Sequence, residues 1–89
     1  MDDERTPSRR AGLELRRTEG GYHLVEEGGA EICALNETAV ALWELCDGET
    51  AVSEMVDAVS ELFSLAAAVA GADVRRALEV LSEVGALER

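Results

Sequence analysis

Residues 35–63 read LNETAVALWELCDGETAVSEMVDAVSELF, and this stretch decides the fold. Asn36 can cap the free N–H groups of a first helical turn, and Glu37 follows it near the positive end of the helix dipole. Apolar residues then recur at helical spacing and form one stripe: Ala39, Leu42, Trp43 and Cys46. The sequence therefore predicts a helix that begins at Asn36 and ends at Asp47 and Gly48.

Two further helices are predicted downstream. After Thr50 the apolar positions keep a helical period through Val52, Met55, Val56, Val59, Leu62 and Phe63. The opposite face carries Glu54, Asp57 and Glu61, which predicts solvated surface. Residues 64–72 could prolong the second helix, but Gly71 and the fall in side-chain size favour a joint there. A third helix is then expected from Asp73, as its cap, to a point before Gly85.

Upstream of residue 35, short segments are separated by glycine pairs. LELRRTE, YHLVEE and AEICALN are divided by Gly20-Gly21 and Gly28-Gly29, and the first two segments alternate apolar and polar residues. This pattern predicts three antiparallel strands. The expected fold is therefore α+β and winged helix-turn-helix-like, with a three-stranded antiparallel sheet followed by three helices. Residues 1–11 are expected to form a flexible arm, and residues 12–89 the domain.

The composition limits the chain to one small core. A chain of 89 residues hides only about 60 to 65% of the surface that its unfolded form exposes. It has one Trp, one Tyr and one Phe, so Trp43 and Phe63 are expected to be the bulkiest core anchors. Cys33 and Cys46 fit no metal-binding spacing and are expected to be ordinary packing thiols, although counting does not exclude a disulfide. With no signal peptide and no spanning segment, the expected location is the cytoplasm.

The charge is unevenly distributed. Residues 18–74 contain twelve acidic side chains and no Lys or Arg. Such a negative field repels phosphate backbones and favours cationic or neutral partners, or it serves only to keep the domain soluble. We therefore expect neither a nucleic acid nor a membrane as partner.

The sequence gives no pattern for catalysis. The chain has no Lys and a single His, His23, so a nucleophile with an adjacent base is not available. The pair Glu26 and Glu27 beside a glycine turn is typical of a hydrophilic turn, and the two glycine pairs are typical of hairpins and not of a phosphate-binding loop. We expect no catalytic residue, no cofactor and no metal.

The third predicted helix carries more apolar surface than a core stripe requires. Val74, Ala77, Leu78 and Leu81 form its centre, and Val80 and Val84 widen the apolar arc to roughly 160°, where about 100° suffices. Either the arm or the first strand covers these two valines, or they line a groove beside an exposed sheet edge. If residues 30–35 form that edge, the groove can pair with an extended peptide.

Several segments in a fixed order resemble the PqqD-like family of peptide-recognition elements. They are Leu35 to Ala39 leading to Leu42-Trp43, Leu45 to Gly48, Val52 to Val56, and Asp73-Val74 with Leu78, Leu81 and Gly85. The resemblance covers residues from about 20 to 88 and implies a non-enzymatic adaptor that binds the leader segment of a ribosomally made precursor peptide. Such an adaptor presents the leader to a modifying enzyme, which is a radical maturase in the pyrroloquinoline quinone pathway.

Family members bind the leader as an added strand beside the third strand and over the third helix. Carried onto this chain, the implied peptide-binding residues are Glu31, Ile32, Cys33, Ala34 and Leu35 on the strand, and Arg76, Ala77, Val80, Leu81 and Val84 on the helix.

Two other classes of protein remain as alternatives. A winged-helix DNA binder would place Arg75 and Arg76 at the start of its recognition helix, but two arginines beside so acidic a segment supply little of the charge that phosphate contacts need. A small dimerisation module would pair the apolar arc with itself. The expected state of the chain is a monomer or a weak homodimer.

Overall fold

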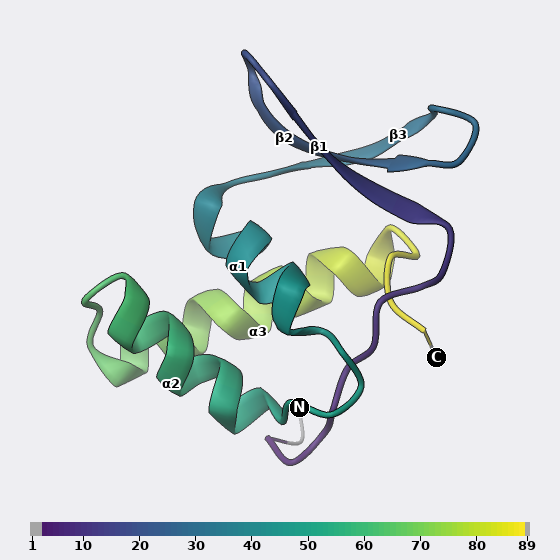
Figure 1. Ribbon diagram of the computed structural model, residues 1–89. Coiled ribbons are helices and arrows are strands. Elements are labelled where there is room, and N and C mark those ends of the chain that lie inside the picture. Colours follow the sequence, from purple (N-terminus) through teal and green to yellow (C-terminus); the bar gives the residue numbers. More distant parts are fainter. Residues whose placement is uncertain (1–2, 89) are drawn as a thin grey trace.

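The three strands form one sheet that lies over the three helices (Figure 1). The computed structural model describes residues 3–88. Its elements are β1 (Leu13–Thr18), β2 (Gly21–Glu26), β3 (Glu31–Leu35), α1 (Glu37–Leu45), α2 (Val52–Leu62) and α3 (Ala67–Glu83). The strand order is β1-β2-β3 with antiparallel neighbours, so β3 lies at one edge. The predicted fold class is confirmed.

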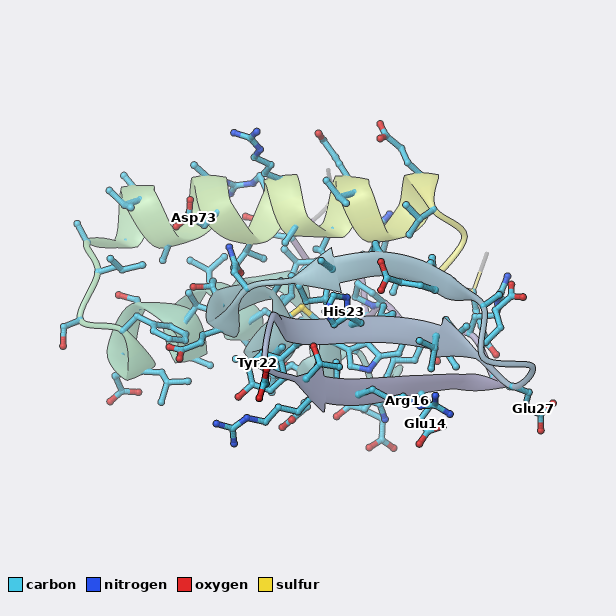
Figure 2. All side chains as sticks on the ribbon, turned by 90° about the horizontal axis from the view of Figure 1, so that it is seen from above. Glu14, Arg16, Tyr22, His23, Glu27 and Asp73 are labelled. Atoms are coloured by element: carbon cyan, nitrogen blue, oxygen red, sulfur yellow. The ribbon has the colours of Figure 1, made fainter. Side chains whose placement is uncertain are left out.

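The sheet turns one face toward the helices and the other toward solvent. The first face carries a row of register partners, Leu15, Leu24 and Cys33. The second carries Arg16, His23 and Ala34 as the neighbouring row, and it faces the viewer in Figure 2. The predicted alternation fails at one point, because the pairing of β2 with β3 shifts between Leu24 and Val25 and both residues are buried. Such an irregularity bends and twists the strand locally.

Helices α1 and α2 begin where the sequence predicted. The Ala39 N–H donates to Asn36 Oδ1 at 2.8 Å, which is the predicted cap. At the start of α2, the residue Ala51 has no side-chain cap to offer, and its own N–H donates to Glu54 Oε1 at 3.1 Å. Gly48, with φ of +80°, turns the chain between the two helices, as predicted.

Helix α3 begins earlier than predicted. Its first residue is Ala67, and Asp73, predicted as the cap, lies inside the helix. The joint is confined to residues 63–66, where Ser64 adopts a left-handed φ of 53° and the Ser60 hydroxyl donates to the Leu65 carbonyl oxygen at 2.6 Å. The prediction was wrong because it treated small residues as a break, whereas alanine has the highest helix propensity of all residues.

The core lies between the sheet and the three helices. Its largest fully buried side chains are Leu24, Leu42, Met55, Leu78 and Leu81. Trp43 is 5% exposed and is a core anchor, as predicted. Phe63 is not, because it is only partly buried at the end of α2. Aliphatic side chains therefore supply most of the core volume.

Residues 3–10 of the predicted arm run along the ends of α1 and α2. The N–H groups of Ser53 and Val52, in the first turn of α2, donate to the Asp3 and Arg5 carbonyl oxygens, each at 2.9 Å. The Arg9 guanidinium donates to the carbonyl oxygens of Trp43 at 3.0 Å and Glu44 at 2.8 Å, at the end of α1. The arm thus satisfies helix-end groups that would otherwise need water. Its expected flexibility stays a prediction, which a variant discussed below tests.

Candidate functional site

A groove of about 400 Å³ separates the end of β3 from α3. In the view of Figure 2, β3 is the strand of the sheet nearest to α3. The residues that line the groove are Ala34, Leu35, Asn36, Thr38 and Ala39 on one side, and Asp73, Arg76, Ala77, Val80 and Leu81 on the other. The site is therefore built by a sheet edge, the first turn of α1 and one face of α3.

Only the end of β3 reaches this groove. Leu35 is buried at 8% exposure and Ala34 is exposed, and both line the groove. The other three strand residues of the implied site, Glu31, Ile32 and Cys33, are not part of the lining. Glu31 Oε1 lies 2.7 Å from His23 Nδ1 instead. Because β3 has a neighbour on one side only, its other side remains free for main-chain pairing among the described residues.

On the helix side, four of the five implied residues line the groove: Arg76, Ala77, Val80 and Leu81. Leu81 is buried and forms part of the core, whereas Val80 remains 42% exposed. Val84, the fifth, is partly buried, packs against the core and does not line the groove. The wide apolar arc predicted from the sequence therefore has two parts: Val80 is exposed in the groove, and Val84 packs against the core at the end of the helix.

Four lining residues were missed by the sequence reasoning: Asn36, Thr38, Ala39 and Asp73. The first three belong to the turn into α1, and Asn36 was interpreted only as a cap. Asp73 was interpreted as the start of a helix. Its spacing of three residues from Arg76 would have placed both on one helix face if the helix had been started earlier.

Two side chains, Asp73 and Arg76, give the groove its charge. Within residues 3–88 neither forms a salt bridge with another protein group. The neighbouring Arg75, in contrast, lies 3.4 Å from Asp3 Oδ2 in the arm. Two arginines that are adjacent in sequence therefore differ in role, because only Arg76 is available to a ligand in the groove.

The groove is lined by main-chain groups, aliphatic side chains, hydroxyl and amide groups and the two charges of Asp73 and Arg76. The lining has no thiol, imidazole or lysine. Across residues 3–88, no group of three His, Cys, Asp or Glu side chains is arranged to hold a metal ion. Both cysteines are free, and burial raises the pKa of Cys46 to about 11 and, together with the charge of Glu31, raises the pKa of Cys33. Neither thiol is poised as a thiolate.

The DNA-binding alternative loses its geometric basis. Arg75 and Arg76 lie in the middle of α3 and not at its start, and Arg75 is paired with Asp3.

No helix among the described residues combines the length and the apolar character that crossing a bilayer requires.

Comparison with solved structures finds a protein of similar fold. The chain is similar to the solution NMR structure of the PqqD truncation of Methylobacterium extorquens PqqCD, which is described as a functional and stand-alone recognition element for ribosomally synthesized and post-translationally modified peptides (RiPPs). The two are 27% identical, with a TM-score of 0.74, and the match covers 93% of this chain and 88% of that one. No curated protein sequence matches the chain.

The sequence model of one protein family, coenzyme PQQ synthesis protein D, matches residues 21–87. This range contains β2, β3 and all three helices, and therefore both walls of the groove. The chain belongs to the PqqD family.

Proposed function

We propose that this chain is a non-enzymatic RiPP recognition element, which binds the leader segment of a precursor peptide and presents it to a modifying enzyme. The observation that carries the proposal is the groove between β3 and α3, in which a free strand edge and an exposed apolar side chain meet. Membership of the PqqD family and the likeness to a stand-alone recognition element support it.

The leader is proposed to bind as a fourth strand beside β3. An extended peptide there pairs its main chain with the free N–H and C=O groups of the edge, and alternate side chains then point toward α3. Val80 and Ala77 offer an apolar contact for such side chains. Glu31, Ile32 and Cys33 lie outside the groove lining, so we propose that they contribute main-chain pairing only.

The two charges of the groove are proposed to set the direction of the bound peptide. Asp73 and Arg76 lie one helical turn apart on α3, and each has a free charge. A leader that carries a basic side chain and an acidic side chain at matching spacing can pair with both in only one orientation.

The first prediction concerns Val80, the exposed apolar residue of the groove. Val80→Glu places a charge where an apolar side chain of the leader would be buried, so we expect peptide affinity to fall by about tenfold or more. Because Val80 is 42% exposed, the free energy of unfolding should change by less than about 1 kcal/mol. Calorimetric titration with a candidate leader peptide measures the first quantity, and denaturant unfolding the second.

Val69 on α3 serves as the matched control, whereas Val84, the C-cap residue of α3, does not. Val69 is 50% exposed and does not line the groove, so Val69→Glu makes the same chemical change without touching the site. Val84 packs against the core, so Val84→Glu should reduce stability and is no test of binding. Equal affinities for the Val80 and Val69 variants would contradict the proposed groove.

Transfer to the modifying enzyme is the second part of the proposal. The family name associates the group with synthesis of the cofactor PQQ, but the enzyme that receives this chain's peptide is set by the pathway. A radical maturase is our proposed partner. The expected place of this exchange is the cytoplasm, where the two free thiols stay reduced.

A further inference from the structure

A second groove lies between α1 and α2, away from the peptide groove. It is lined by Ala41, Glu44 and Leu45 of α1 and by Ala58, Glu61 and Leu62 of α2. Leu62, the most exposed large apolar side chain among residues 3–88, is 67% exposed. A leucine side chain with this much solvent exposure, beside two alanines in the same groove, is typical of a contact surface.

The rim of this groove is acidic on both sides. Glu44 and Glu61 contribute one carboxylate from each helix. Neither forms a salt bridge with a side chain of residues 3–88. Residues 18–74 contain no Lys or Arg, and the Arg9 guanidinium at the end of α1 donates to the carbonyl oxygens of Trp43 and Glu44 and forms no salt bridge with either carboxylate. A ligand that inserts an apolar side chain into this groove therefore binds most favourably when Lys or Arg residues flank that side chain.

We propose that this α1–α2 groove is a docking site for a basic amphipathic helix of a partner protein, with an apolar side chain against Leu45 and Leu62 and Lys or Arg side chains toward Glu44 and Glu61. A second copy of this chain fits poorly, because it would bring two acidic rims together. Nucleic acids and anionic membranes are repelled for the same reason.

Helix α1 is shared by the two grooves. Its first turn, with Thr38 and Ala39, lines the peptide groove, and its last turn, with Glu44 and Leu45, lines the α1–α2 groove. The two sites therefore use different residues, and a partner in one does not cover the other. A protein that presents a peptide needs this separation, but the docking site does not depend on the identity of the peptide.

The second prediction distinguishes binding in the α1–α2 groove from nonspecific electrostatic attraction between the acidic chain and a basic peptide. The probe is a fluorescein-labelled amphipathic helical peptide of about 18 residues, with leucines on one face and flanking lysines, titrated by anisotropy at about 150 mM salt. Leu62→Glu adds a negative charge and removes the apolar contact. We expect its affinity for the peptide to fall by about tenfold or more, while Val69→Glu stays within about twofold of the unmodified chain.

A second pair of variants tests the acidic rim. Glu61→Lys and Glu27→Lys change the net charge equally, but Glu27 lies at the exposed turn after β2, far from the groove (Figure 2). We expect Glu61→Lys to weaken binding several-fold more than Glu27→Lys. The same peptide with Glu in place of Lys should not bind, and Val80→Glu should leave binding unchanged, which keeps this test independent of the peptide groove.

Three results would overturn the proposal. The first is no binding of the lysine peptide to the unmodified chain, and the second is tighter binding by Leu62→Glu, which would mark diffuse electrostatic attraction. The third is a concentration-dependent dimer in sedimentation that Leu62→Glu abolishes, which would assign the groove to a second copy of this chain.

Discussion

The two cysteines illustrate how burial sets the reactivity of a single residue, with the charge of Glu31 adding to its effect at Cys33. Cys46 follows α1 and is fully buried in the core, whereas Cys33 lies on β3 and is partly exposed. The apolar spacing Ala39, Leu42, Trp43, Cys46 predicted the burial of Cys46, because all four fall on one helix face. The apolar spacing of the second helix could not predict that Phe63 is only partly buried, since position on a stripe does not reveal where the facing layer ends.

The third prediction follows from the pKa of Cys46, which burial raises from 9.0 to about 11. Between these values the unfolded chain loses the thiol proton while the folded chain keeps it, so the unfolded state binds fewer protons. Stability must therefore fall as the pH rises through this window. We expect denaturant unfolding at about pH 8 and about pH 10.5 to show a smaller loss of stability in Cys46→Ala than in the unmodified chain. Equal losses would mean that the pKa of Cys46 is not raised in the folded chain.

At the scale of elements, the strands and the first two helices were predictable because their signals are local. Glycine pairs, an Asn cap and a regular apolar period each act within a few residues. The start of α3 was not predictable in this way. Residues 67–72 are mostly alanine, and whether they are helical depends on propensity and packing rather than on a pattern of apolar residues. Gly71 lies buried inside α3, where it leaves room for Arg75, whose guanidinium would come within 2.9 Å of an added Cβ.

This error also hid part of the candidate site. With the helix start placed at Asp73, the aspartate was given a capping role and its alignment with Arg76 was not considered. Helical periodicity alone pointed to Val80 as a site residue, and Leu81 entered the predicted site only through the resemblance to the family. The contribution of the turn at Asn36 and Thr38 required the three-dimensional packing of α1 against β3 and α3.

The fourth prediction concerns the arm as an element. Arg9 donates two hydrogen bonds to the carbonyl end of α1 and lies 5.9 Å from the centre of the Trp43 ring. Arg9→Ala should therefore lower the free energy of unfolding by about 1 to 3 kcal/mol. Arg16→Ala is the matched control, because Arg16 is exposed on β1 and pairs only with Glu14 at 3.5 Å, so its loss should cost less than about 0.5 kcal/mol. Equal effects in urea unfolding would support the flexible arm expected from the sequence.

For the whole molecule, the distribution of charge decides which partners can approach. The net charge is −11, and the positive side chains are confined to the two ends of the sequence. In the folded chain several of these arginines are already engaged: Arg9 with carbonyl groups, Arg10 with Glu26 at 3.3 Å and Arg75 with Asp3. The sequence predicted the negative field correctly, but only the structure shows how few cations remain free.

The fifth prediction is that the chain does not bind duplex DNA. Binding requires several basic side chains on one face to release counterions from the phosphates, and α3 offers only Arg76 without a partner among residues 3–88. A gel-shift titration with a nonspecific duplex at about 50 mM salt, where such attraction is strongest, should show no retarded band. A basic winged-helix protein on the same gel is the control. A clear shift by this chain would revive the DNA-binding alternative.

Strand β1 lies outside the matched family range of residues 21–87, yet it pairs with β2 along all six of its residues. A fragment trimmed to that range would leave two strands over the helices and would expose the side of β2 that β1 now covers. With β1 in place, the edge away from α3 belongs to a strand whose exposed side chains include Glu14, Arg16 and Arg17. Charged side chains on an edge strand disfavour the addition of a further strand. Beyond its contribution to the core, β1 thus makes the far edge of the sheet a poor partner, so that the edge of β3 is the favoured place for an incoming strand.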